Sequence, residues 1–268
     1  MSDGAGEQVR ERKPLRVAVL GLGEAGGRLA AELAAAGAEV RGYDPDPGRE
    51  EPAVARAPTA AVAVGGCDAV LSVNSAKAAL EAAEAALPAL RAGALYADLN
   101  TASPALKREL AALAERAGAR FADVALLGPV PERGLRTPAL ASGTGAAAFA
   151  ELFGPLGMPV TVVSPEAGEA AARKLLRSVF MKGLAAAVVE SMQAAEAAGC
   201  GEWLAREIEA VVGRRYLERA LAGSRAHAAR RVDEMEAARE LLVELGVEPH
   251  VASASAAQLA GLAAARGR

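Results

Sequence analysis

A glycine-rich turn that directly follows a short apolar run is the feature that most constrains the fold. The segment VAVLGLGEAGGRLA (17–30) places Gly21, Gly23 and Gly26 in a G-x-G-x-x-G pattern between a run typical of a buried strand and a run typical of a helix. Glycines with this spacing permit a tight turn, close approach of the backbone to a pyrophosphate, and close packing of helix on strand. The helix N-terminus behind the turn attracts phosphate. In this context the pattern predicts a dinucleotide site, in preference to a glycine-rich turn without a ligand.

A carboxylate is expected on the adenine side of that site. Asp44 ends the second predicted strand (38–44), where it can accept hydrogen bonds from ribose hydroxyls and repel a 2′-phosphate. Asp44 therefore favours NAD over NADP, although Arg49 lies close enough to weaken the preference. The residues expected to contact NAD or NADP are Gly21, Leu22, Gly23, Glu24, Ala25, Gly26, Asp44, Val73, Asn74 and Asn100.

Apolar runs alternate with helical patterns through the first 164 residues. The runs predict strands at 15–20, 38–44, 67–74, 94–100, 120–126, 139–143 and 159–164. Between them lie helical patterns ending near 36, spanning 76–93, and starting at Ser103 as N-cap with Pro104 in the first turn. This alternation predicts an α/β fold with a mostly parallel, doubly wound sheet.

The pattern changes near Pro165, where strand signals stop and helical periodicity runs to the C-terminus. The expected organisation is a disordered lead (1–14), a Rossmann domain that binds NAD(P) (15–164), and an all-α domain for substrate binding and dimerisation (165–268). The last of these begins with a long helix at about 166–198.

Composition argues against several classes of protein. The net charge is −3 with no run of basic residues, so a nucleic-acid partner is not expected. The sequence has neither an unbroken apolar segment of about 18 residues nor an apolar signal core near its N-terminus, so we expect a cytoplasmic protein without a membrane span. Cys67 and Cys200 are expected to be reduced, and no spacing of His and Cys suggests a metal.

The only two asparagines, Asn74 and Asn100, each end a predicted strand. Ligands of open α/β sheets bind outside the carboxyl ends of the strands, so both amides are expected beside the nicotinamide. Ser75 and Thr101 lie next to them. The alternative is that both asparagines are ordinary loop residues.

Two of only five lysines lie in the long helix, in GEAAARKLLRSVFMKGLAA (168–186). Lys174, Ser178 and Lys182 are spaced i, i+4, i+8 and share one broad helix face. The pKa of a lysine in an apolar cleft is lowered, which suits proton transfer near neutral pH, whereas arginine does not release its proton. The alternative is a lysine that extends along the helix edge to reach water.

Three motifs together resemble the β-hydroxyacid dehydrogenases, which include 3-hydroxyisobutyrate and 6-phosphogluconate dehydrogenases. They are GLGEAG, DLNTASP (98–104) and GEAAARKLLRS (168–178). LRSVFMKG and HAARRVDEM (227–235) resemble a bacterial subgroup whose C-terminal domain is a variant of the phosphogluconate type. The resemblance implies an NAD(P)-dependent dehydrogenase that acts on a CH–OH group. It also implies that Lys174, which follows Gly168 as in the family's G-x-x-x-x-x-K-x-x-x-N motif, is the general acid/base.

The sequence departs from this family at two places. Ser178 stands where the family has Asn, and Leu127 in DVALLGP stands where the family's substrate loop D-x-P-V-S-G-G has Ser. Asp123 and Gly128 of that loop are retained. The substrate is therefore expected to differ from an ordinary hydroxyisobutyrate-like acid.

The expected substrate contacts extend beyond the lysine helix. Arg136, which follows Arg133 in the next loop, is either an anion contact or a solvated residue. His227, Arg230 and Arg231 either line the far wall of the substrate cleft or form a solvated face with Glu234 and Glu236. The full set is Asn100, Thr101, Ser178, Lys182, Arg136, His227 and Arg231.

Two other functions remain open, an imine reductase, which usually lacks the lysine, and a sensor or scaffold that binds NAD(P) without turnover. A homodimer through the all-α domain is expected because that Ala-rich half has few aromatic residues to cover its apolar helix faces.

Overall fold

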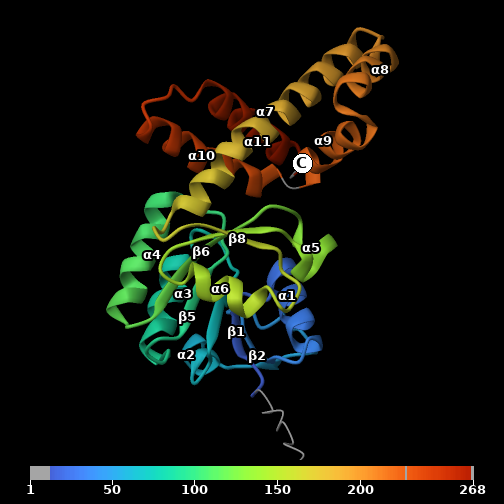
Figure 1. The fold of residues 1–268 in the computed structure, drawn as a ribbon. Coiled ribbons are helices and arrows are strands. Elements are labelled where there is room, and N and C mark those ends of the chain that lie inside the picture. Colours follow the sequence, from blue (N-terminus) through green and yellow to red (C-terminus); the bar gives the residue numbers. More distant parts are fainter. Residues whose placement is uncertain (1–12, 227, 267–268) are drawn as a thin grey trace, which may run out of the picture.

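The computed structural model describes residues 13–226 and 228–266, and places a sheet below a group of helices (Figure 1). The strands are β1 (Arg16–Leu20), β2 (Glu39–Tyr43), β3 (Ala55–Arg56), β4 (Ala69–Ser72), β5 (Leu95–Asp98), β6 (Arg120–Leu126), β7 (Ala139–Ser142) and β8 (Val160–Ser164). They form one sheet in the order β3-β2-β1-β4-β5-β6-β7-β8. The predicted α/β class and Rossmann-type sheet are confirmed.

Only the β6–β7 pair is antiparallel among the described strands. The connection between them, residues 127–138, is interrupted by Pro129, Gly134 and Pro138, and it holds only α5 (Val130–Arg133) and a 3₁₀ turn (Gly134–Arg136). A parallel return usually crosses over through a full α-helix, which this connection does not contain. The chain therefore folds back directly on itself at this point.

Helices cover both faces of the sheet. They are α1 (Glu24–Ala35), α2 (Ala60–Val64), α3 (Ala79–Ala86), α4 (Pro104–Arg116) and α6 (Ala146–Phe153). Along β1, Val17 and Val19 enter the core beneath α1 and α6, whereas Ala18 and Leu20 enter the core beneath α2, α3 and α4. Burial on both faces explains why the central strands are apolar throughout.

The sequence analysis did not predict α2, α6 or the two-residue strand β3, and it predicted a longer α3. Helix α3 gives way to a 3₁₀ turn at Leu87–Ala89, because Pro88 has no amide to continue the α-helical ladder. Helix α4 begins as predicted, with Ser103 Oγ accepting a hydrogen bond from the Leu106 amide at 3.3 Å.

Helices alone make up the described chain after β8. They are α7 (Glu169–Ala197), α8 (Gly201–Val212), α9 (Arg214–Ala226), α10 (Ala228–Glu244) and α11 (His250–Arg266). Leu175 at the base of α7 packs with Met235 of α10 and Leu259 of α11. A second, smaller core joins the upper part of α7 to α8 and α9, and α8 lies at the end of the helical half that is far from the sheet (Figure 1).

Helix α7 thus passes through the whole helical half, and its N-terminal end lies against the sheet. Within the described residues, no helix combines the length and the apolar character that a membrane span requires.

Candidate functional site

The glycine-rich turn has a geometry that only glycine permits at two of its three positions. Gly21 has φ 101°, and a Cβ added there would lie 2.3 Å from the Val73 carbonyl oxygen. A Cβ at Gly26 would lie 1.8 Å from the Gly21 carbonyl oxygen. Both values are far below van der Waals contact, so these two glycines allow α1, the turn and β4 to pack together.

Gly23 differs, because a Cβ there would meet only the guanidinium tip of Arg49, at 2.9 Å. Gly23 is also the N-cap residue of α1, and no side chain caps this helix end. An N-terminus with uncapped amides beside an open backbone suits the phosphates of a dinucleotide. Leu22, Glu24 and Ala25 belong to the same turn.

Asp44 lies beside this turn and is buried, with 5% of its surface exposed. Its carboxylate accepts a hydrogen bond from the Leu22 amide at 2.8 Å and one from the Asp46 amide at 2.9 Å. The Arg56 guanidinium donates to the Asp44 carbonyl oxygen at 2.8 Å. The loop after β2 therefore presents a fixed carboxylate with two arginines, Arg49 and Arg56, nearby.

The structure brings the two asparagines together at the carboxyl ends of β4 and β5. Asn100 Nδ2 donates to Asn74 Oδ1 at 2.9 Å, and both side-chain amides contact the Ser72 hydroxyl. Val73, which precedes Asn74, is the residue packed against Gly21. The expected nicotinamide contacts and the glycine turn thus share one edge of the sheet.

The sequence analysis gave no role to a buried ionic cluster beneath this edge. Lys107 of α4 contacts Asp98 at 2.6 Å and Asp123 at 3.1 Å, and all three side chains are at most 1% exposed. A signal was present, since Lys107, Leu110 and Ala114 share the buried face of α4 at helical spacing. Asp98 also accepts a hydrogen bond from Asn100 Nδ2 at 2.6 Å.

The same cluster holds the beginning of α7. Asp123 accepts a hydrogen bond from the Ala171 amide at 2.9 Å, and Ser142 Oγ accepts one from the Ala170 amide at 3.0 Å. Gly168 is the N-cap residue with φ 97° and has no side chain to cap the helix. The first amides of α7 are therefore satisfied by the sheet, and a negative carboxylate at a helix N-terminus is electrostatically favourable.

Lys174 lies one turn further along α7 and is half-buried. Its Nζ donates a hydrogen bond to Thr101 Oγ1 at 2.6 Å. Burial lowers the pKa of Lys174 to about 8, and the positive charges of Lys107, Lys182 and Arg230 act in the same direction, against the charge of Glu234. The amine can therefore gain or lose a proton near neutral pH.

Glu234 of α10 faces Lys174, Ser178 and Lys182 on α7. Ser178 Oγ donates to Glu234 Oε1 at 2.5 Å, and Lys182 Nζ donates to the same oxygen at 2.8 Å. Burial by itself would raise the pKa of Glu234, but the charges of Lys182 and Lys174 outweigh it and lower the pKa. Sequence analysis had placed Glu234 only on a possible solvated face, and the packing of α10 on α7 brings it inward.

The other residues expected to contact substrate do not lie together. Arg231 is half-buried on α10, where its guanidinium donates to Ser224 Oγ at 3.2 Å and burial lowers its pKa. Arg136 is exposed in the turn after α5, and its charge acts on Glu32 of α1. His227 lies outside the described residues.

No group of three or more metal-binding side chains occurs within residues 13–226 and 228–266.

Residues 16–153 match the model of the NAD binding domain of 6-phosphogluconate dehydrogenase, which spans just over half of the 268-residue chain. The chain belongs to this family. The resemblance expected from its motifs is thereby confirmed. Residues 195–262 match a domain of unknown function, and no curated protein matches the chain.

Three solved structures illustrate the range of similar proteins. The conserved protein MTH1747, of unknown function and structurally similar to 3-hydroxyacid dehydrogenases, is 31% identical over 94% of this chain and 98% of its own, with a TM-score of 0.71. The 3-hydroxyisobutyrate dehydrogenase of Mycobacterium tuberculosis, with L-serine, is 23% identical over 94% of each chain, with a TM-score of 0.80.

A reductive aminase from Aspergillus terreus, in complex with NADPH4, cyclohexanone and allyl amine, is 21% identical over 90% of each chain, with a TM-score of 0.64. This chain therefore has the NAD(P)-binding fold that hydroxyacid dehydrogenases share with a reductive aminase.

Proposed function

We propose that the protein is an NAD(P)-dependent dehydrogenase that oxidises a CH–OH group of a small hydroxyacid-type substrate, or reduces the corresponding oxo group. The observation that carries the proposal is the hydrogen bond from Lys174 Nζ to Thr101 Oγ1 at 2.6 Å. It puts an amine with a lowered pKa next to Asn100, on the sheet edge that also carries the glycine turn.

The glycine turn, Asp44 and the paired asparagines would hold the dinucleotide. A bound nicotinamide would accept hydride from the substrate in oxidation and donate it in reduction. The neutral Lys174 amine accepts the hydroxyl proton as the carbon loses hydride, and the ammonium form returns a proton to the oxygen in reduction. Thr101 holds the amine at the edge between turnovers, and the substrate hydroxyl would take the place of its Oγ1.

The charges around Lys174 support an anionic substrate. Lys182, Arg230 and Arg231 are cations near Lys174, and Glu234 is the carboxylate whose charge acts on Lys174 and Arg231 and which pairs with Lys182. Because Glu234 already accepts from Ser178 and Lys182, we expect the substrate to bind nearer to Lys174 and the arginines of α10.

We propose NAD as the preferred cofactor, because the Asp44 carboxylate is fixed where it would meet the ribose hydroxyls and would repel a 2′-phosphate. Arg49 and Arg56 are the residues that would accommodate NADP.

The second candidate is an imine reductase, which the shared fold with a reductive aminase supports. Lys174 favours an alcohol substrate, because its amine can accept the proton that a hydroxyl group releases. The third candidate, a protein that binds NAD(P) without turnover, is favoured by the departures at Ser178 and Leu127.

A substrate panel discriminates these candidates. Hydroxyacids with NAD or NADP, and oxoacids and imines with NADH or NADPH, are followed by the absorbance of the reduced nicotinamide. Turnover of a hydroxyacid or oxoacid supports the dehydrogenase, and turnover of imines alone supports the reductase. Cofactor binding in calorimetry without turnover of any compound supports the sensor.

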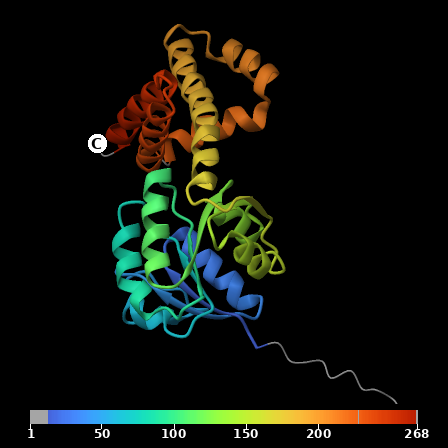
Figure 2. The ribbon, with the colours of Figure 1, turned by 60° about the vertical axis from the view of Figure 1, so that its left-hand side comes forward.

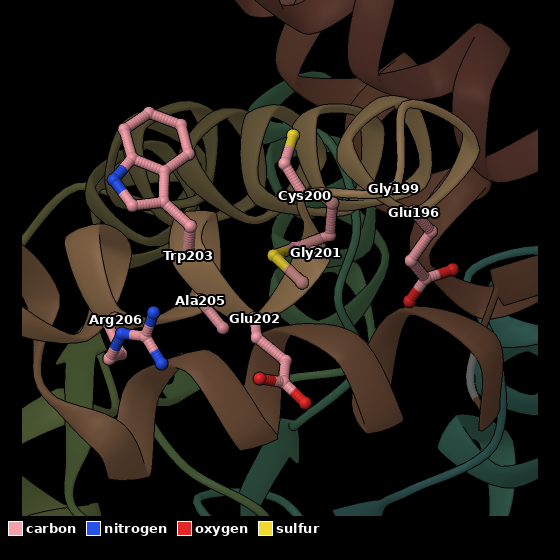
Figure 3. A pocket seen from close by; sticks show the side chains of 9 residues that line it. Glu196, Gly199, Cys200, Gly201, Glu202, Trp203, Ala205 and Arg206 are labelled. Atoms are coloured by element: carbon pink, nitrogen blue, oxygen red, sulfur yellow. The ribbon is translucent and has the colours of Figure 1, made fainter.

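We also propose a homodimer formed through the helical half. Helix α8 has no buried residue, and Trp203 and Val211 are 55% and 85% exposed. Trp203 stands at the rim of a hollow of about 800 Å³ between the end of α7 and the start of α8 (Figure 3). A second copy would cover the apolar side chains of Trp203 and Val211.

A further inference from the structure

We infer that Lys107 is a positioning residue that fixes the proton-transfer lysine relative to the cofactor edge. The catalytic role of Lys107 rests on the proposed function, whereas the geometry rests on contacts between described residues. Lys107 lies on α4, which reaches up to the point where α7 leaves the sheet (Figures 1 and 2).

Lys107 joins two neighbouring strands through one ammonium group. Its Nζ lies 2.6 Å from Asp98 Oδ1, 2.9 Å from the Asp98 carbonyl oxygen and 3.1 Å from Asp123 Oδ1. Asp98 and Asp123 are paired in register on β5 and β6. Without a cation between them, two buried carboxylates would face each other, which is strongly unfavourable.

Each of the two carboxylates uses its other oxygen to hold a part of the proposed site. Asp98 Oδ2 accepts from Asn100 Nδ2 at 2.6 Å, on the cofactor edge. Asp123 Oδ2 accepts from the Ala171 amide at 2.9 Å, at the start of the helix that carries Lys174. The bridge from Asn100 to α7 therefore runs through Lys107 and involves no solvent-exposed group.

The charges of the bridge are balanced by the helix it holds. Lys107 with Asp98 and Asp123 leaves one net negative charge, which lies at the positive N-terminal end of α7. Burial alone would lower the pKa of Lys107, but the two carboxylates outweigh it and raise the pKa, so Lys107 stays charged. The Lys107 ammonium is buried and held by two carboxylates, so it is not available to the substrate proton, which separates its role from that of Lys174.

The bridge fixes the position of Lys174, the proposed proton-transfer residue, relative to the edge where the nicotinamide would transfer hydride. Thr101, which contacts Lys174, directly follows Asn100, and Lys174 follows Ala171 by one helical turn. Replacing Lys107 removes the link between Asp98 and Asp123. Lys174 and the cofactor edge are then no longer held at a fixed position relative to each other.

The test compares Lys107→Met with Leu110→Ala in the full-length protein. Leu110 lies on the same buried face of α4 and is 0% exposed, so its truncation destabilises the same core without touching the charges. A second control is Arg108→Met, whose exposed side chain lies 4.0 Å from Glu244.

Two measurements are made. The first is the pH dependence of acetylation of each lysine by acetic anhydride, followed by mass spectrometry, which titrates Lys174 whether or not any substrate turns over. The groups that act on this titration are Glu234, Lys107, Lys182 and Arg230. The second is kcat and KM, with the substrate found in the panel.

We expect Lys107→Met to move the Lys174 titration upward from about 8, because a positive charge is removed and Asp98 and Asp123 lose their partner. We expect kcat to fall about 10- to 100-fold while KM changes little, as a small misplacement of reacting groups would produce. Leu110→Ala and Arg108→Met should keep the wild-type titration and kcat.

The inference is overturned if folded Lys107→Met shows the Lys174 titration and kcat of Leu110→Ala. Should Lys107→Met fail to fold, the double variant with Asp123→Asn removes one of the two carboxylates that lose their cation and keeps an acceptor for the Ala171 amide. Full kcat in that variant would also overturn the inference. A protein without turnover whose Lys174 titration moves as expected would contradict the proposed function and support the bridge.

Discussion

Lys174 Nζ donates a hydrogen bond to Thr101 Oγ1 at 2.6 Å, although the two residues are 73 positions apart in the chain. Thr101 follows β5 on the sheet, and Lys174 belongs to the long helix that begins the helical half. The contact therefore joins the edge expected to carry the nicotinamide to a residue able to transfer a proton.

Lys174→Arg should retain the positive charge and lose turnover, because guanidinium does not release its proton in the working pH range. Removal of a general acid/base typically lowers the rate by about 10²- to 10⁴-fold. Steady-state kinetics gives the loss, and calorimetry should give a nearly unchanged cofactor affinity.

The pH profile gives an independent check on the same residue. Because Lys174 has a pKa of about 8, oxidation should quicken as pH rises through that value and reduction should slow. The arginine variant should lack this limb. Lys182→Arg is the control, since it can keep the ion pair with Glu234, and a greater loss in that variant would mean that Lys182 is the acid/base.

Glu234→Gln should move the Lys174 limb of the pH–rate profile to lower pH. The charge of Glu234 raises the pKa of Lys174, so its removal lets burial and the neighbouring cations lower that pKa further. Gln keeps an acceptor for Ser178. Glu236→Gln is the matched control, because Glu236 pairs with Arg239 on the exposed side of α10, and an equal shift in both variants would refute the assignment.

Gly23→Val should abolish dinucleotide binding in a protein that still folds. A Cβ added at Gly23 meets only the end of the Arg49 side chain, and the valine would occupy the place of the pyrophosphate. Gly26→Ala should instead lose stability, since its Cβ would overlap the Gly21 carbonyl. Calorimetric titration with NADH and NADPH measures the loss of binding, and thermal unfolding measures the loss of stability. Unchanged cofactor affinity in folded Gly23→Val would contradict the proposed dinucleotide site.

Asp44→Asn should raise the ratio of NADP to NAD efficiency. Asn still offers an oxygen to the Leu22 amide but carries no charge to repel a 2′-phosphate. The ratio of kcat/KM values for the two cofactors is the measurement, and Asp46→Asn, at an exposed position two residues further along the loop, is the control. A ratio that stays constant or falls would show that Asp44 does not contact the ribose.

The dimer is tested by light scattering at micromolar concentration. Wild type should have twice the monomer mass, and Trp203→Glu or Val211→Glu should give monomers, because a charge would be buried in an apolar interface. Val62→Glu, at an exposed position of α2 in the sheet half, should remain a dimer. A monomeric wild type would refute the proposal.

The sequence by itself determined the fold class and the cofactor turn. Both depend on local pattern: apolar runs form strands buried on two faces, and the G-x-G-x-x-G turn joins a strand to the next helix, where Gly26 approaches the Gly21 carbonyl. The helix face shared by Lys174, Ser178 and Lys182 likewise follows from helical spacing alone.

Only the tertiary structure decided which distant groups meet these residues. The antiparallel β7, the bridge from Lys107 to Asp98 and Asp123, and the contact of Glu234 with Lys182 depend on how strands and helices pack. Nothing in the local sequence distinguishes Glu234 from Glu236 as the inward carboxylate. A buried charge is stable only where the fold provides its partner, so these assignments required the whole chain.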